Sequence, residues 1–113
     1  MTTNHHEVIF AIVNAGFAED AMEVAREQGA RGGTILGGRG VAGEKEAAFF
    51  GITIHADKEI LMMVVEKSIR DQVLAALYQQ MGMGKAAQGI AFSLPVSDVA
   101  GLVKLPEAEE ESN

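Results

Sequence analysis

The residues best suited to bind a charged ligand lie in one glycine-rich stretch, from Gly29 to Gly43. Its 15 residues hold seven of the 13 glycines in the chain. Glycine reaches positive φ at little steric cost and lets the backbone approach a ligand closely, so this density indicates special backbone geometry. Thr34 to Leu36 favour a short strand, and Arg31 and Arg39 flank it in an otherwise acidic chain. We therefore predict a strand followed by a loop that faces an anion.

The same stretch contains Gly38-Arg-Gly-Val-Ala-Gly43, which matches the dinucleotide-binding pattern G-x-G-x-x-G. That pattern binds a pyrophosphate only where it opens a helix between two strands. Here Glu44-Lys-Glu46 leads within a few residues to another apolar segment, which leaves no room for a crossover helix. Two interpretations stay open: a turn whose backbone N–H groups bind an anion, with Arg39 adding charge, or a loop that contacts a protein partner.

Three histidines, His5, His6 and His55, are the first candidates for a metal site. Adjacent residues of an extended segment point to opposite faces, so His5 and His6 do not readily ligate one ion. The chain has no cysteine, and none of its serines lies in a nucleophile elbow. We therefore expect neither a metal site nor a catalytic centre, and the chain is not expected to be an enzyme.

Composition limits the class of protein. A length of 113 residues with 48% apolar content fits one folded domain with a single core. The longest apolar runs are far shorter than the roughly 20 residues that span a bilayer, and no basic start leads into an apolar signal region. We expect a cytoplasmic protein that does not insert into a membrane. The net charge of −7 argues against a nucleic-acid partner.

Hydrophobic patterns predict the elements that position these residues. Strand-like segments are Glu7 to Val13, Thr34 to Leu36, Phe49 to Ile54, Ile60 to Val65 and Ile90 to Leu94. Apolar residues at helical spacing predict one helix over Phe17 to Ala25 and a second over Ile69 to Leu77. We interpret His55 to Glu59 as a hairpin turn, and Ser68 with Asp71 as a capping box for the second helix.

Although five segments are strand-like, we interpret the overall order as βαββαβ, with four strands. This order predicts an α+β, ferredoxin-like fold, in which a four-stranded antiparallel sheet carries both helices on one face. The strands are apolar on both sides, so the other face would expose more apolar surface than a monomer tolerates, and a second subunit is expected to cover it. We assign residues 1–105 to this domain and residues 106–113, with four glutamates, to an acidic flexible tail.

Three segments resemble the P-II (nitrogen regulatory) signalling family, and most closely its divergent P-II-like members. They are Ala30-Arg-Gly-Gly-Thr34, Phe49-Phe-Gly-Ile-Thr53 and Gly89-Ile-Ala-Phe-Ser-Leu-Pro-Val96. The resemblance implies a homotrimer that binds an adenine nucleotide in clefts between subunits. It also implies a sensor that regulates a protein partner, which we expect to be a membrane transporter, through the loop after the second strand, the T-loop.

The nucleotide site is assigned from this resemblance together with the nearby cations. The first part of the site consists of Gly33, Thr34, Arg39, Gly40 and Val64. The second part consists of Lys85, Ala87, Gln88, Gly89 and Ile90. No tightly bound cofactor is expected beside the exchangeable nucleotide.

Three phosphate-binding charges of the family are absent from this chain. Ile90 stands where the family has a lysine, and Gly101 and Val103 stand where it has two arginines. The remaining donors are the backbone N–H groups of residues 87–89, with Lys85 and Arg39, which is too few for a third phosphate. We therefore expect ADP or AMP to bind at least as well as ATP.

The T-loop is short in this chain, and it contains no tyrosine for covalent modification. We assign partner binding to Val41, Ala42, Gly43, Glu44, Lys45, Glu46, Ala47 and Ala48. Two alternatives stay open. One is an interaction module that binds no nucleotide, because the phosphate-binding charges are missing, and the other is a metal or small-anion sensor on the same scaffold.

Overall fold

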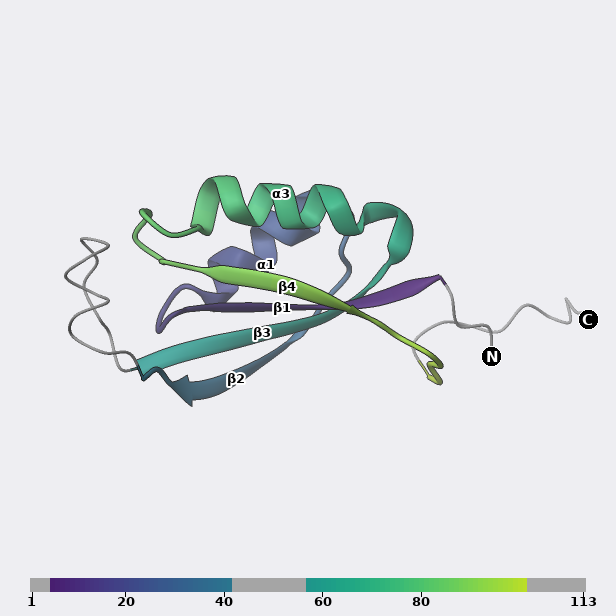
Figure 1. The fold of residues 1–113 in the computed structure, drawn as a ribbon, viewed down its shortest axis with the longest axis horizontal. Coiled ribbons are helices and arrows are strands. Elements are labelled where there is room, and N and C mark those ends of the chain that lie inside the picture. The colour runs from purple at the N-terminus through teal and green to yellow at the C-terminus, as the bar shows by residue number, and fades with distance from the viewer. Residues whose placement is uncertain (1–4, 42–56, 102–113) are drawn as a thin grey trace, which may run out of the picture.

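The predicted ferredoxin-like arrangement is confirmed. A computed structural model describes residues 5–41 and 57–101 of the chain. Its elements are β1 (His6–Asn14), α1 (Ala18–Glu27), β2 (Thr34–Arg39), β3 (Asp57–Glu66), the 3-10 turn η1 (Lys67–Ile69), α3 (Arg70–Met81) and β4 (Ile90–Pro95). The strands form one antiparallel sheet in the order β2-β3-β1-β4, and both helices lie on one face of it (Figure 1).

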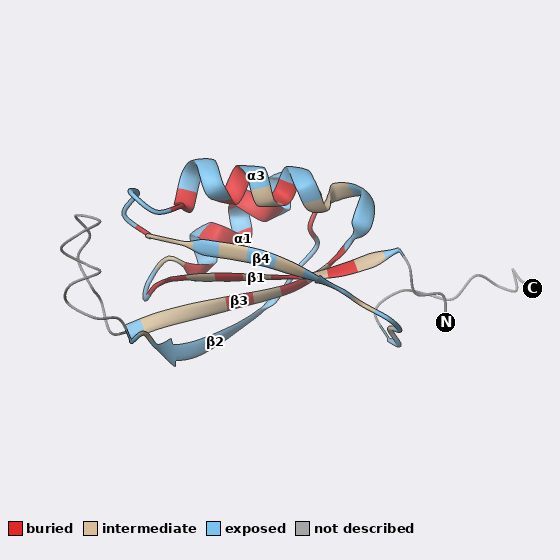
Figure 2. Cartoon of the chain, in the orientation of Figure 1, coloured by how far each residue is buried: buried red, intermediate tan, exposed pale blue. Residues whose placement is uncertain are grey.

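The core lies between the helices and the two central strands. Side chains alternate across a strand, so Ile9 and Val13 of β1 and Leu61 of β3 all point toward the helices, where each is at most 1% exposed. Alanines on the inner side of α1, such as Ala21, let the helix approach the sheet closely. Figure 2 shows the buried residues gathered between the layers, whereas every residue of the edge strand β2 is exposed.

The opposite face of the sheet is apolar and carries no helix among the described residues (Figure 1). We call this surface the open face. Strand register aligns its side chains in cross-strand rows: Ile90, Ile12, Ile60 and Leu36; then Phe92, Phe10 and Met62; then Leu94, Val8 and Val64. The rings of Phe10 and Phe92 stack with centroids 5.4 Å apart. Phe92 and Leu94 remain 42% and 50% exposed on this face.

Two sequence-based boundaries are wrong. β3 begins at Asp57, so Asp57 to Glu59 belong to a strand and not to a hairpin turn. β2 continues to Arg39, so Gly37, Gly38 and Arg39 pair with β3 instead of forming a loop. An edge strand with both faces exposed gives its side chains little to pack against, so glycine is tolerated there. The predicted strand from Phe49 to Ile54 lies outside the described residues.

The two helices begin in different ways. The N-cap residue of α1, Phe17, has no capping side chain; instead Glu59 Oε1 of β3 accepts hydrogen bonds from the N–H groups of Gly16 and Ala18, both at 3.0 Å. The predicted capping box at α3 is wrong, because η1 precedes the helix, its N-cap residue is Ile69, and no side-chain cap bond forms. Within the described residues, neither helix is long and apolar enough to cross a membrane.

A buried carboxylate lies beneath the start of α3. Glu7 of β1 is 4% exposed and its Oε2 lies 3.4 Å from Nη1 of Arg70. The pKa of Arg70 is raised, first by its hydrogen bond and charge interaction with Asp71 and then by Glu7. The Arg70 guanidinium is protonated at every pH below its ordinary pKa. The contribution of its contacts with Asp71 and Glu7 to the stability of the fold is therefore fully present across the neutral range, and it is lost only at strongly alkaline pH.

Candidate functional site

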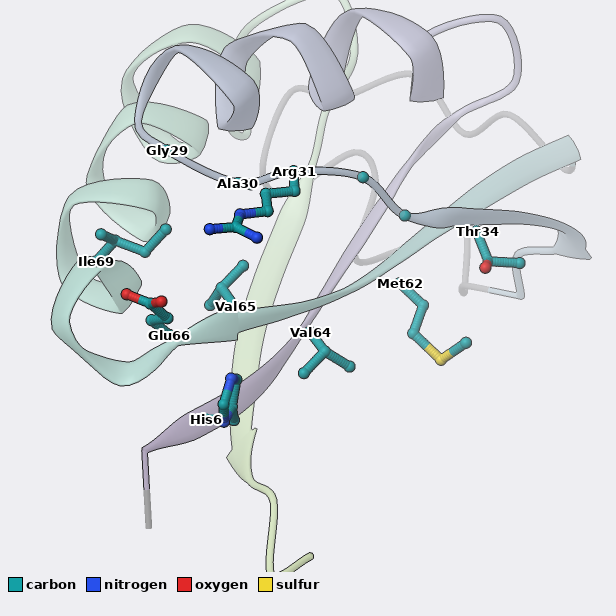
Figure 3. Close-up of a pocket in the computed structure, with 12 residues that line it drawn as sticks. His6, Gly29, Ala30, Arg31, Thr34, Met62, Val64, Val65, Glu66 and Ile69 are labelled. Carbon is teal, nitrogen blue, oxygen red and sulfur yellow. The ribbon is translucent and has the colours of Figure 1, made fainter. Parts of the chain in front are cut away.

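Three of the predicted nucleotide-binding residues lie together in a pocket on the β2 side of the sheet. Gly33, Thr34 and Val64 line a cavity of about 330 Å³ between the segment before β2 and the second half of β3 (Figure 3). With Arg39 and Gly40, at and after the end of β2, we call them the edge group. Arg39 and Gly40 are not part of the pocket lining.

The pocket also contains polar residues that were not assigned to the site from the sequence. Arg31 extends over it from the segment before β2, Glu66 enters from the end of β3 and His6 from the start of β1 (Figure 3). The buried Nδ1 atom of His6 has no hydrogen-bond partner among the described residues. Of these three residues, only Arg31 could have been associated with the site from the sequence, because it lies among the glycines. The other two could not be placed without the strand register, because they come from strands far apart in sequence.

Gly33 is required by close packing and not by an unusual backbone conformation. A Cβ atom at this position would lie 2.8 Å from the carbonyl oxygen of Met62 and 2.9 Å from Leu61 Cδ1. Among the described glycines of the glycine-rich stretch, only Gly29 has positive φ, at 109°. The prediction of special backbone geometry is therefore wrong for most of this stretch, and the close approach at Gly33 is to β3 of the same chain.

The remaining predicted nucleotide-binding residues lie in and after the loop between α3 and β4. We call Lys85, Ala87, Gln88, Gly89 and Ile90 the loop group. The loop is held by its own backbone, since Gln88 N–H donates to the carbonyl of Lys85 at 3.0 Å and Gly89 N–H donates to that of Met81. Gln88 adopts a left-handed conformation with φ of 48°. The loop is thus a defined turn built around short local bonds.

These bonds reduce the number of donors that the loop can offer to phosphate. Of the three N–H groups expected to bind phosphates, those of Gln88 and Gly89 already donate to backbone carbonyls within the fold. The N–H of Ala87 makes no hydrogen bond with the part of the chain that the structure describes, although its side chain is buried. Lys85 is exposed at the tip of the loop.

The two groups lie on opposite sides of the subunit. Thr34 belongs to β2 at one edge of the sheet, while Ile90 opens β4 at the other edge, with β3 and β1 between them. The Ile90 side chain is 55% exposed on the open face. A single subunit therefore does not bring the edge group and the loop group into one site.

The assigned partner-binding loop is almost entirely outside the described residues. Only Val41 is described, and its side chain is 94% exposed. Ala42 to Ala48 and His55 lie beyond the described part of the chain. Within residues 5–41 and 57–101, no three His, Cys, Asp or Glu side chains are grouped as a metal site would require.

The sequence matches no protein-family model and no curated protein. The fold, however, is similar to solved structures. Arabidopsis thaliana PII bound to citrate has a TM-score of 0.64 and 23% identity, covering 88% of this chain and 82% of that one. The B. subtilis GlnK-ATP complex has a TM-score of 0.59 and 17% identity, covering 86% of each chain.

A third structure is CPII from Thiomonas intermedia K12 in its apo form, described as a nitrogen regulatory PII-like protein. Its TM-score is 0.57 at 16% identity, with 79% of this chain and 86% of that chain covered. The resemblance inferred from sequence motifs is thus supported by structural neighbours that are PII and PII-like signalling proteins at low identity. The chain has the fold of these signalling proteins.

Proposed function

We propose that this chain is a regulatory protein of the PII-like type that binds an adenine nucleotide between the subunits of a homotrimer. The proposal rests on the shared fold, on ATP bound to the structural neighbour GlnK, and on the residues of the edge and loop groups. It assigns the chain a sensing role and no catalytic one. The proposed domain is residues 1–105, with residues 106–113 as an acidic tail.

The observation that carries this proposal is the separation of the two residue groups. Each group lies at a different edge of a sheet whose open face is apolar and exposed. When copies of the chain bury their open faces against one another, the edge group of one subunit can meet the loop group of the next. The same association would remove Phe92 and Leu94 from water, which favours the assembly.

The number of phosphates is limited by the donors that this site offers. Lys85, Arg39 and the N–H of Ala87 are the candidates, while the N–H groups of Gln88 and Gly89 already have partners. A charge-assisted bond contributes about 1.5 to 3 kcal/mol, so a third phosphate without one is not compensated for its lost hydration. ADP or AMP is therefore proposed to bind at least as well as ATP.

The proposed output is a protein partner, with a membrane transporter as the expected class, contacted through residues 41–48. The nearly complete exposure of Val41, where the chain leaves β2, supports a contact surface at this end of the sheet. A cytoplasmic location follows from the same proposal.

Two measurements on the full chain test this function. Light scattering at micromolar concentration is expected to give about three times the chain mass of 12.0 kDa, and a monomer would exclude an intersubunit site. Calorimetry with ADP, AMP and ATP, each with and without magnesium, is expected to show ADP or AMP binding no weaker than ATP. A trimer that binds none of them would indicate an interaction module, and heat from a divalent cation alone would indicate a metal sensor.

A further inference from the structure

One buried amide side chain joins two parts of the chain that the proposed function uses separately. Asn14 is the last residue of β1 and is 5% exposed. Among the described residues, it and Glu7 are the polar ones that are buried. A buried polar side chain must have its hydrogen bonds satisfied, so its partners show what it holds in place.

The partners of Asn14 come from two different elements. Its backbone N–H donates to the carbonyl of Ala87 at 2.9 Å, and Nδ2 donates to the carbonyl of Ala86 at 3.1 Å. Its Oδ1 accepts a hydrogen bond from Nζ of Lys58 at 2.8 Å. An ammonium group only donates and a carbonyl only accepts, so these partners determine which end of the amide faces which side.

These contacts lie in one row across the sheet. Lys58 of β3 is paired with Asn14 on one side and with Gly38 of β2 on the other. The row therefore begins at the loop of residues 82–89 and passes through Asn14 and Lys58. It ends at Gly38, one residue before the end of β2. Two of the proposed phosphate contacts, Lys85 and Ala87, lie at one end of this row, and Arg39 with the start of the proposed T-loop lies at the other.

We propose that Asn14 is a positioning residue that couples the loop of residues 82–89 to the end of β2 and the start of β3. This inference rests on the proposed function. When the Ala86 carbonyl moves, the buried amide must follow it or lose a hydrogen bond, and either change alters the bond to Lys58. A nucleotide phosphate bound at Lys85 or at the Ala87 N–H thereby shifts the base of the T-loop, and a partner bound there affects the nucleotide equally.

Substitution of Lys58 separates coupling from a local structural role. Lys58→Met keeps roughly the length of the side chain and removes the donor to Asn14, but it changes no residue of the loop that Asn14 contacts. A structural role predicts effects on β2 and β3 alone. Coupling predicts that the substitution also changes the loop of residues 82–89, on the other side of Asn14. There the N–H groups of Gln88 and Gly89 donate hydrogen bonds to backbone carbonyls, which amide exchange can monitor.

The test is amide hydrogen exchange, followed by NMR on the full-length protein without ligand. Lys58→Met is expected to accelerate exchange at Gln88 and Gly89 about fivefold, and Lys58→Gln is a second variant should the first fold poorly. Lys67→Met, at an exposed lysine beyond the other end of β3, is the matched control and should leave both amides unchanged. Exchange at Gln88 and Gly89 within about twofold of wild type in both Lys58 variants would overturn the coupling.

A second measurement separates this inference from the proposed function. Saturating ADP is expected to change exchange at Glu59 of β3, which is not among the proposed nucleotide contacts, in the wild type but not in Lys58→Met. An ADP response at Glu59 that survives in Lys58→Met would also overturn the role of Asn14. If the wild type binds no adenine nucleotide, the proposed function fails, while the exchange experiment without ligand still decides the coupling.

Discussion

At the scale of single residues, the glycines of the glycine-rich stretch differ from what their density along the chain predicted. Their density predicted left-handed backbone, but Gly33, Gly37 and Gly38 are not among the glycines with positive φ. Gly33 is instead required by the Met62 carbonyl, whereas an added Cβ at Gly37 would meet nothing within 4 Å. Neighbouring glycines thus differ in their packing, and only the structure distinguishes them.

Alanine substitution at these two positions is expected to have opposite effects. Gly33→Ala should lower the free energy of unfolding by about 2 kcal/mol, because backbone or core side chains must shift to admit the Cβ. Gly37→Ala should raise it by about 0.5 kcal/mol through the lower entropy of the unfolded chain. Urea denaturation at one fixed protein concentration measures both. Equal effects at the two positions would contradict the packing at Gly33.

Arg39 is expected to contribute to nucleotide affinity, although it is distant from the loop group in its own subunit. Arg39→Ala should weaken ADP binding about tenfold, equivalent to about 1.4 kcal/mol, by removing one charge-assisted bond to phosphate. Calorimetry measures the change. Arg26→Ala is the control, since Arg26 lies on α1 and pairs with Glu23. Unchanged ADP affinity in Arg39→Ala would remove Arg39 from the site.

At the scale of elements, the start of α1 is determined by a residue far away in sequence. Glu59 of β3 supplies the acceptor that a local N-cap residue would normally provide, and it also pairs with Val13 across the β1–β3 ladder. The sequence-based interpretation placed Glu59 in a turn, so this contact could not be anticipated. Helix α1 is thus positioned over the sheet by the strand beneath it.

Glu59→Ala is expected to lower the free energy of unfolding by about 1 to 2 kcal/mol, the usual effect of removing an N-cap acceptor. Two N–H groups lose their partner at once. Glu66→Ala removes an exposed carboxylate at the other end of the same strand and should change the stability by less than about 0.5 kcal/mol. Urea denaturation compares them. Similar losses for both variants would show that Glu59 does not act as the cap.

At the scale of the whole molecule, the sheet is apolar on both faces, but helices cover only one of them. The central strands bury Ile9 and Leu61 against the helices and present Phe10 and Ile60 on the open face. A monomer rarely leaves such a surface in water. The assembly is therefore expected to depend on the open face, with the helices turned outward.

A charge placed on the open face should disrupt the proposed trimer. Phe92→Glu puts a carboxylate beside Phe10, where the packed assembly would have to desolvate it, so a monomer is expected at micromolar concentration. Light scattering gives the mass, and circular dichroism shows whether the fold persists. Tyr78→Glu, on the outer side of α3 at 75% exposure, is the control and should remain trimeric. A trimeric Phe92→Glu protein would place the interface elsewhere.

Element order, fold and the apolar character of both sheet faces could be predicted, because they follow from periodicity along the chain. The ends of β2 and β3 could not, since Gly37, Gly38 and Asp57 are poor strand formers that join the sheet through backbone pairing alone. Among the residues that line the pocket, Gly33 and Thr34 were assigned to the nucleotide site from the sequence, whereas His6 and Glu66 could be placed only with the strand register. Burial of Asn14 likewise depends on contacts between distant segments.

The position of β1 in the sheet has a consequence for how the chain folds during synthesis. β1 is the first strand to leave the ribosome, yet both of its neighbours come later, and Ile12 must wait for Ile90 to pair on its β4 side. The chain must lose the conformational entropy of the long intervening loops before such distant contacts can stabilise it. Folding is therefore expected in milliseconds to seconds and not in microseconds. Until β4 is made, the nascent chain carries an apolar strand with an unpaired edge, which is the form most prone to aggregate.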